Sequence, residues 1–491
     1  IPGPTITMIP GNKYVLRFRN TLPYEPLNPI HNILKDPNAS NMHTHGLHIS
    51  GESPGDDVTR AFEGGFGGDF VYDIAADHMG GTHWYHAHHH GSTFLQVACG
   101  AFGMLVIDDS GDGIPANVAS MAEKQIVLGF LDTSVAGAGG DTLVSGTLSP
   151  TWTVNGDVGG TISAQLDTWQ HWRVLIADTD AKDKVLSFGP ECEVVLLARD
   201  GVWRTSAPGV VTNNDIQITG ASRADFAVRV SANSQLQIDG LVVASIAADG
   251  LPDTSSHPYA PDGVSLWSAV RPSYLRELRN VPASNINLET VSMGASDINN
   301  VPFDANVPLF AYTTDKVQEW RLQGAKNHPF HMHIYHVQAQ ETKDDFEAGE
   351  YYDTISENMD VRFDLSTATA SPFAGRTIFH CHILEHEDQG AMAWADVTGG
   401  TPSPTFPLDG DIPEPYSEYY SVMLPIGDAN GDGVFNNADI APFVLALTNP
   451  VAYQAMFPDV DTEIVLDMNG DGGFDNADIA GFVAALTGGK K

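Results

Sequence analysis

The 491-residue chain is poor in basic side chains and in long apolar stretches. No apolar run approaches the ~20 residues that a membrane-spanning helix needs, so the sequence predicts no membrane span. Only 24 lysines and arginines stand against 62 acidic residues, which gives a formal net charge of -38. Phosphate contacts need clustered basic residues, so this balance argues against nucleic-acid binding. It predicts instead a well-solvated surface, typical of an exported protein.

Cysteine is also scarce, with three residues in the whole chain. Cys381 lies between two histidines in "HCHILEH" (380–386), which leaves Cys99 and Cys192 as candidates for a disulfide. Such a bond would suit an oxidising compartment, but the sequence leaves the pairing open. The chain begins at Ile1 without an initiator methionine, as it would after removal of a signal peptide. We therefore expect a secreted, extracellular or cell-surface protein, with the periplasm as the alternative.

The pattern of apolar residues predicts a mainly β protein. Three strand-like segments, "KYVLRFRN" (13–20), "QHWRVLIAD" (170–178) and "QEWRLQGAKN" (318–327), recur along the chain, and the rest is rich in glycine, proline, threonine and valine without a long helical period. Short strands of this kind favour Greek-key β-sandwiches or barrels. The predicted organisation is a first domain (1–112), a middle domain without metal ligands (113–275), a third domain (276–400), a proline-rich linker (401–425) and a separate tail module (426–491).

Histidines are concentrated in two distant segments. Ten of the 19 fall between His31 and His90, and seven between His328 and His386, whereas the long middle of the chain holds only His171 and His257. A general structural role would scatter histidines along the chain. We therefore expect the two rich segments to meet in space.

Four His-x-His pairs occur in these segments. On a strand, residues i and i+2 face the same side, so each pair presents two imidazoles together. Eight neutral imidazoles suit late first-row metals, and copper has the highest affinity among them. A closed structural zinc site could not use so many ligands. The pairs are His43 and His45, His86 and His88, His331 and His333, and His380 and His382.

Cys381 faces away from the pair that flanks it. It can join His328 and His386 in a trigonal His₂Cys site, the ligand set of an electron-transfer copper. The tripeptide 380–382 would then serve two metal sites, one on each side of a strand.

Four ordered motifs, "HTHGLH" (43–48), "GTHWYHAH" (81–88), "HPFHMH" (328–333) and "HCHILEH" (380–386), make residues 1–400 resemble a laccase-like multicopper oxidase. The resemblance implies three cupredoxin-like domains, about four copper ions and a trinuclear cluster between the first and third domains. By position, His43 and His331 would bind the type 2 copper, and His328, Cys381 and His386 the type 1 copper. The type 3 pair would be held by His45, His86, His88, His333, His380 and His382.

The same resemblance implies oxidation of a small donor, one electron at a time, and reduction of O₂ to water. Proton delivery to O₂ requires a nearby acid. Glu387 occupies the family's acidic position after "HCHILEH", and Asp56, with Asp57 as neighbour, is the match after "HTHGLH". Many relatives have a methionine ligand five residues after the second type 1 histidine. Here that position is Ala391, and Met392 follows it, so the axial ligand stays open.

Five further histidines lie beside the predicted ligands but outside the register of the pairs. We expect them to support the ligands or to lie at the surface. They are His48, His83, His89, His90 and His336.

The tail contains two near-identical segments 39 residues apart, "DANGDGVFNNADIAPFVLAL" (428–447) and "DMNGDGGFDNADIAGFVAAL" (467–486). Oxygen-bearing side chains at loop positions 1, 3, 5, 9 and 12, with glycine at position 6, have the spacing of EF-hand loops, so two Ca²⁺ ions are expected. The tail resembles a dockerin, which implies docking to a cohesin-like partner. The predicted calcium ligands are Asp428, Asn430, Asp432, Asn436 and Asp439, then Asp467, Asn469, Asp471, Asp475 and Asp478.

Three functional classes follow. The first is an oxidase of phenols or aromatic amines. The second is a metal-ion oxidase of Mn(II), Fe(II) or Cu(I), for which the acidic stretch "ETKDDFEAGEYYD" (341–353) could attract cations. The third is a non-catalytic copper-binding protein for surface assembly or storage. A copper nitrite reductase shares the fold, but the full set of eight paired histidines argues against it.

Overall fold

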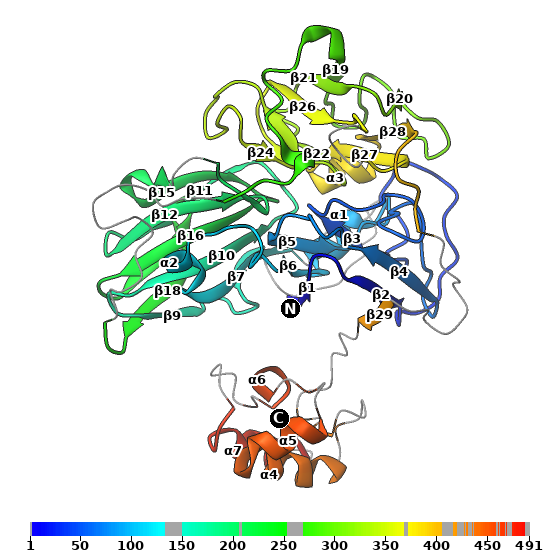
Figure 1. Cartoon of the computed structure of the whole chain (residues 1–491). Helices are drawn as coiled ribbons and strands as arrows, with labels where there is room; N and C mark the ends of the chain where they lie inside the picture. The colour runs from blue at the N-terminus through cyan, green and yellow to red at the C-terminus, as the bar shows by residue number, and fades with distance from the viewer. Residues whose placement is uncertain are drawn as a thin grey trace. The chain divides into compact units, whose positions relative to one another are not determined.

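The computed structural model describes residues 2–132, 150–205, 209–252, 269–367, 372–404 and 416–419. In the tail it describes 427, 429–430, 435, 437–457, 460, 462–466, 468 and 474–486. The chain divides into two compact units, 1–419 and 420–491, and each is considered by itself. The first unit is built mainly from strands, which confirms the predicted mainly β fold (Figure 1).

The first domain is built on two small sheets. One has the strand order β1-β6-β5-β3 and the other β29-β2-β4. Strand β3 pairs with β5, and this pairing sets His43 opposite His86. The elements are β1 (Gly3–Met8), β2 (Lys13–Arg19), β3 (His43–His45), β4 (Gly67–Asp73), β5 (Gly81–His86), α1 (Thr93–Ala98) and β6 (Phe102–Ile107).

The middle domain packs its own apolar core between two sheets. Their orders are β13-β12-β16-β10-β7-β8, with β14 paired to β12, and β15-β11-β17-β18-β9. The elements are α2 (Ala116–Ala119), β7 (Ala122–Leu131), β8 (Thr151–Val154), β9 (Thr161–Gln165), β10 (Trp169–Ala177), β11 (Asp183–Phe188), β12 (Cys192–Arg199), β13 (Val202–Trp203), β14 (Gly209–Val210), η1 (Thr212–Asn214), β15 (Asp215–Thr219), β16 (Arg223–Val230), β17 (Ser234–Ile238), β18 (Leu241–Asp249) and η2 (Ser273–Leu275).

The third domain also has two sheets, with the orders β19-β21-β26-β23-β24 and β20-β28-β27-β22-β25. Strand β22 pairs with β27, which sets His331 opposite His380. The elements are η3 (Ala283–Asn285), β19 (Ile286–Ser292), β20 (Phe310–Thr313), β21 (Val317–Gln323), β22 (Phe330–Met332), β23 (Val337–Ala339), β24 (Tyr351–Tyr352), β25 (Thr354–Ile355), β26 (Asp360–Asp364), β27 (Gly375–Cys381), α3 (Leu384–Asp388) and β28 (Met392–Thr398).

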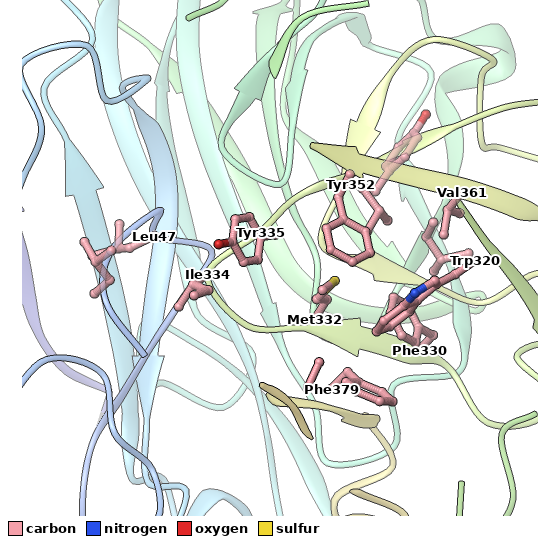
Figure 2. Packing of buried hydrophobic residues seen from close by; sticks show 14 of the residues in the cluster. Leu47, Trp320, Phe330, Met332, Ile334, Tyr335, Tyr352, Val361 and Phe379 are labelled. Carbon is pink, nitrogen blue, oxygen red and sulfur yellow. The ribbon is translucent and has the colours of Figure 1, made fainter. Parts of the chain in front are cut away.

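One apolar cluster joins the first and third domains. Leu47 of the first domain belongs to the same buried cluster as Trp320 and Phe379 of the third (Figure 2). Its large aromatic side chains remove much apolar surface from water, and this burial is the main favourable contribution to domain packing. The cluster therefore brings the two histidine-rich segments together, as the sequence predicts.

Part of the predicted linker belongs to the first domain's sheet. Residues 416–419 form β29 (Tyr416–Tyr419), which runs parallel to β2 from Lys13↔Tyr416 to Leu16↔Tyr419. Tyr416 packs on Val15 and Val71. The chain thus covers one edge of β2 before it enters the tail.

The secondary-structure elements described in the tail are all helices. A small apolar core includes Phe443, Tyr453 and Phe482. Among the residues that the structure describes, no helix is long and apolar enough to cross a membrane. The elements are η4 (Asn437–Asp439), α4 (Ile440–Thr448), α5 (Pro450–Met456), α6 (Thr462–Val465) and α7 (Asp478–Leu486).

The candidate disulfide is not formed. Cys99, which follows α1, and Cys192, which begins β12, are both free thiols, as is Cys381. Cys99 lies in the first domain and Cys192 in the middle domain. The cysteines therefore give no evidence for an oxidising compartment.

Candidate metal centre

All eight paired histidines are fully buried in one place. They come from β3, β5, β22 and β27 or from the residues that follow these strands, and each is exposed by 1% or less. The rings of His43 and His333 stack at 3.8 Å, and those of His45 and His331 at 3.7 Å, across the junction of the first and third domains. The structure therefore brings together every pair that the sequence singles out.

Three groups made up only of these rings have ligand atoms within 4.8 Å of one another, and a further group joins His43 and His333 to Asp56. Two groups are separate trios, His45 with His86 and His382, and His88 with His333 and His380. The remaining histidines, His43 and His331, form a group with His45. This division has the form of two three-histidine sites beside a two-histidine site.

The free nitrogens of these rings fit a set of bound cations. In seven of the eight rings at least one buried nitrogen has no hydrogen-bond partner, which is rare for a polar atom in a protein interior. In the His88 trio, Nε2 of His380 lies 3.2 Å from Nε2 of both His88 and His333. Three ring nitrogens that converge in this way form a cage of electron-pair donors. Neutral imidazoles are the donor type that copper prefers.

The nitrogens that face away from the centre are held in place. Nδ1 of His43 lies 2.6 Å from Oδ2 of Asp56, and Nδ1 of His331 donates to the backbone oxygen of Asp353 over 2.8 Å. Nε2 of His45 lies 3.0 Å from Oδ1 of Asp353. A hydrogen bond at one ring nitrogen fixes which nitrogen remains for a metal. These partners therefore select the donor atom of each ring.

Burial keeps the imidazoles neutral. It lowers the pKa of His86 to about 3 and that of His380 to about 4, because a charged ring would lose its hydration. The pKa of His43 is also held well below its usual value, by burial and then by the neighbouring histidines. A neutral ring can donate the lone pair of one nitrogen to a metal at pH values near 7.

The third predicted site consists of Cys381, His328 and His386. Nδ1 of His386 lies 3.6 Å from Sγ of Cys381 and 3.2 Å from Nδ1 of His328. Cys381 is buried, whereas both histidines are half-buried. Burial raises the pKa of the Cys381 thiol to about 12, so a bound cation would be needed to hold it as a thiolate. The residues fit a His₂Cys copper site close to the protein surface.

Met392 packs away from this site. It lies opposite His380 in the β27–β28 pairing and belongs to a small apolar cluster with Val58, Phe303 and Trp394. Ala391 is fully buried, and its backbone oxygen accepts the N–H of Cys381 over 2.9 Å. The structure therefore places the Met392 side chain among apolar residues, and Ala391, whose side chain has no donor atom, beside Cys381.

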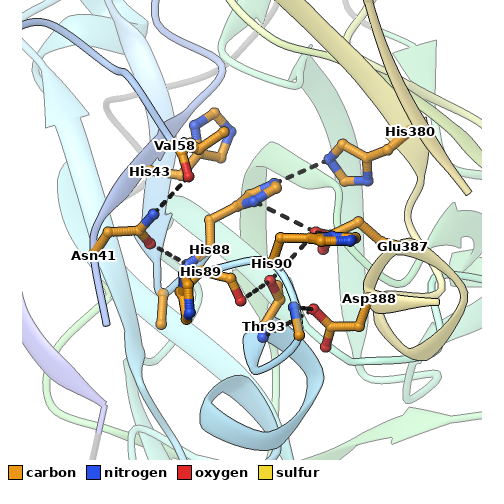
Figure 3. A network of polar contacts seen from close by, with 12 residues as sticks. Asn41, His43, Val58, His88, His89, His90, Thr93, His380, Glu387 and Asp388 are labelled. Atoms are coloured by element: carbon orange, nitrogen blue, oxygen red, sulfur yellow. Dashed lines mark hydrogen bonds and ion pairs between the residues drawn. The ribbon is translucent and has the colours of Figure 1, made fainter. Parts of the chain in front are cut away.

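Both predicted acids are buried beside ligands. Oε1 of Glu387 lies 3.6 Å from Nδ1 of His88 and 3.8 Å from Nδ1 of His90, and it accepts from the hydroxyl of Thr93 over 3.3 Å (Figure 3). Burial raises the pKa of Glu387 well above its usual value, as it does that of Asp56. Asp388, the last residue of α3, is also buried. Its carboxylate accepts backbone N–H groups at the start of α1 and so holds α3 against α1.

Of the five other histidines near the ligands, four are buried and His90 is half-buried. Three of them make a hydrogen bond through one ring nitrogen: His48 and His336 donate to the backbone oxygens of Ile334 and Asp200, and Nε2 of His90 lies 2.9 Å from the Asn32 side chain. His89 and His83 are also buried, the first with Nε2 3.6 Å from an Asp36 oxygen.

Sequence reasoning missed two residues, Asp353 and Arg223. Asp353 lies within the acidic stretch that could attract cations, and Arg223 lies in the domain predicted to have no ligands. Both are fully buried and paired to each other. Nothing in their local spacing marks them, because 130 residues separate the pair.

The tail candidates are only partly within the described residues. Oδ1 of Asp439 accepts the backbone N–H of Asn430, and Oδ1 of Asp478 accepts that of Met468. Asp475 is described as well, and its side chain accepts the N–H of Ala477. The other predicted calcium ligands lie outside the described residues: Asp428, Asp432, Asn436, Asp467, Asn469 and Asp471.

Known proteins share this architecture. A multicopper oxidase of Staphylococcus haemolyticus is 23% identical over 418 residues, which cover 81% of this chain and 82% of that protein. A laccase of Bacillus subtilis is 23% identical over 476 residues, covering 81% and 88%. The crystal structure of a laccase from Pediococcus acidilactici matches with a TM-score of 0.62 at 20% identity, covering 81% of this chain and 84% of that chain.

Two family models, both described as multicopper oxidase, match residues 1–112 and 274–400. These two ranges contain every histidine of the three groups as well as His328, Cys381 and His386. The first unit therefore has the architecture of three cupredoxin-like domains. The chain is a homologue of the multicopper oxidases and laccases, which are O₂-reducing oxidoreductases.

Proposed function

We propose that this protein couples the one-electron oxidation of phenolic or aromatic amine donors to the four-electron reduction of O₂ to water. The observation that carries the proposal is the tripeptide 380–382. His380 and His382 belong to the two buried trios, whereas Cys381, between them, belongs to the half-buried site with His328 and His386. One strand thus joins a site near the surface to a site deep in the interior.

Copper, when bound, would supply the reversible one-electron chemistry and bind O₂ at the histidine cluster. The chain would divide the remaining work. His328 and His386 lie close enough to the surface for a donor to approach. Cys381 gives electrons a covalent path to His380 and His382 through its own peptide bonds. The cluster histidines are shielded from water, which limits the escape of partly reduced oxygen.

An organic donor is favoured over a metal ion because the acidic stretch 341–353 is largely neutralised. Glu347 pairs with Arg204 through two contacts of 2.9 Å, and Glu350 pairs with Arg271. Asp353 pairs with Arg223 in the same way. These acids join domains, so they do not form a free cation-attracting surface. A metal-ion oxidase remains the alternative, and a non-catalytic copper-binding protein is an outcome of the tests below.

Glu387 is the proposed proton donor to the cluster, with Asp56 in a similar position at the other side. A buried acid whose pKa is raised keeps its proton to a higher pH than an exposed carboxyl group does, and it can give that proton to reduced oxygen. Glu387 lies beside His88. On its other side, the His90 ring lies between Glu387 and Asn32, with Nδ1 facing Glu387 and Nε2 facing the Asn32 side chain. Asp56 contacts His43 directly.

For the tail we propose calcium binding and docking to a cohesin-like partner. Asp439 and Asp478 occupy the last loop position of the two repeats, and both are fully buried at helix starts. Beside them a groove of 290 Å³ is lined by equivalent positions of the repeats, among them Ile440 and Ile479, and Val444 and Val483. Exposed apolar residues at matched positions suit a protein partner. Such docking would place the enzyme outside the cell or at its surface.

The oxidase proposal is tested first by Cys381→Ser. We expect the copper-loaded protein to be intensely blue and to consume O₂ with a phenolic donor, and the serine variant to lose both properties because no thiolate remains. Absorption spectra and an oxygen electrode measure the two. Cys99→Ser, which changes a cysteine away from the ligands, should stay blue and active. A blue Cys381→Ser protein would refute the assignment.

The proton role is tested by Glu387→Gln, which keeps the shape but removes the acid. We expect kcat to fall by about 10²–10⁴-fold at unchanged copper content, because a general acid contributes about that much. Since the acid must be protonated to act, wild-type kcat should decline as pH rises through the raised pKa, and the variant should lose this decline. Glu385→Gln, on the exposed side of α3, is the matched control. Equal pH profiles for wild type and Glu387→Gln would exclude the role.

The tail is tested by two truncations. A chain ending at Tyr419 retains β29, so it should keep full oxidase activity and lose binding of about two Ca²⁺ ions in calorimetry. A chain ending at residue 404 also loses β29 and exposes the edge of β2, so its thermal midpoint should be lower. Undiminished Ca²⁺ binding by the chain ending at Tyr419 would contradict the calcium proposal.

A further inference from the structure

Arg223 of the middle domain reaches the histidine cluster. It begins β16, and its side chain is fully buried. Its guanidinium contacts Asp353 of the third domain through two parallel hydrogen bonds, Nη1 to Oδ1 at 3.0 Å and Nη2 to Oδ2 at 2.5 Å. Its Nε also donates to the backbone oxygen of Thr82 in the first domain over 3.2 Å. One side chain therefore connects all three domains at this point.

Asp353 in turn contacts two of the proposed copper ligands. Its Oδ1 lies 3.0 Å from Nε2 of His45, and its backbone oxygen accepts Nδ1–H of His331 over 2.8 Å. These contacts leave Nδ1 of His45 and Nε2 of His331 without a protein partner. The rings stack with their planes 13° apart. The position of one residue thus sets the orientation of two ligands from different domains.

The surrounding contacts make this arrangement rigid. Thr354 donates its hydroxyl to Oδ1 of Asp353 over 3.0 Å, and the backbone N–H of Arg223 donates to Asp200 over 3.1 Å. Nearby, the Glu347–Arg204 and Glu350–Arg271 pairs anchor the same segment of the third domain to the middle domain. A planar guanidinium held in this way fixes a carboxylate in both position and rotation, which a lysine ammonium cannot do.

We propose that Arg223 and Asp353 form a positioning pair through which the middle domain, which supplies no ligand, orients His45 and His331 for copper. The inference rests on the proposed function, because it concerns the geometry of the copper cluster. Groups that hold the outer nitrogen of a histidine ligand affect metal binding, and their loss commonly weakens it by about 10–100-fold.

The test compares copper-loaded wild type with Arg223→Lys and Asp353→Asn. Both variants retain every ligand. We expect the type 1 blue absorption to remain, the apparent copper affinity of the cluster to fall by about 10–100-fold, and the hyperfine splitting of the type 2 electron paramagnetic resonance signal to change. Copper is measured by elemental analysis after dialysis against a graded chelator.

Arg173→Lys is the matched control. Arg173 is also a buried arginine of the middle domain, and it binds Thr82, Asp225, Asp109 and Glu123 but no proposed ligand. This variant should keep the wild-type copper content and resonance spectrum, even if its thermal midpoint falls. The double variant Arg223→Met with Asp353→Asn removes both charges and should show the same cluster defect if a single variant does not fold.

The proposal is overturned if Arg223→Lys, Asp353→Asn and the double variant have the affinity and spectrum of wild type, or if Arg173→Lys shifts both measures equally. Wild-type protein without a type 2 signal would instead refute the proposed function. The two failures are therefore distinguishable.

Discussion

The alternation of side chains from the end of β27 into the residue that follows it is the constraint on which the rest of the site depends. An extended chain turns consecutive side chains to opposite sides, so His380 and His382 face one region and Cys381 another. Partners must then be available on both sides. The first domain supplies four histidines to the inner side through β3 and β5, and His328 and His386 complete the outer side. Packing of the first domain on the third is thus a requirement of the metal centre, and the shared apolar cluster with Leu47 and Trp320 provides it.

Burial of so many polar rings creates a second constraint. Eight imidazoles without water must remain neutral, and most keep an unsatisfied nitrogen. Such atoms cost free energy until a ligand meets them, so binding of copper and stability of the domain junction are coupled. The carboxylates of Asp56 and Asp353 and several backbone oxygens hold the outer nitrogens. These partners fix the ring orientations that a metal at the junction would require.

Local patterns explain what the sequence could predict. The two residues of a His-x-His pair share one face of a strand, because their spacing equals the period of the strand, and four such pairs predict the cluster. The short strand-like segments predict the mainly β fold. Arg223 and Asp353 could not be found in this way, since their contact depends on how the middle domain docks. The same reason applies to β29, in a proline-rich segment that resembles a linker, and to the acidic stretch 341–353, whose partners are distant arginines. The tail repeats predict calcium ligands, of which only Asn430, Asp439, Asp475 and Asp478 lie within the described residues.

The central claim is that one tripeptide joins a donor site to an O₂ site. Its most direct test is to reduce the copper-loaded protein fully without air, remove the excess donor, and then add O₂ while the blue absorption is followed. If O₂ binds only at the cluster, the blue colour returns rapidly, as electrons leave the Cys381 site through His380 and His382. A cluster that is reoxidised while the protein stays colourless would show that the two sites are not connected and would contradict the account.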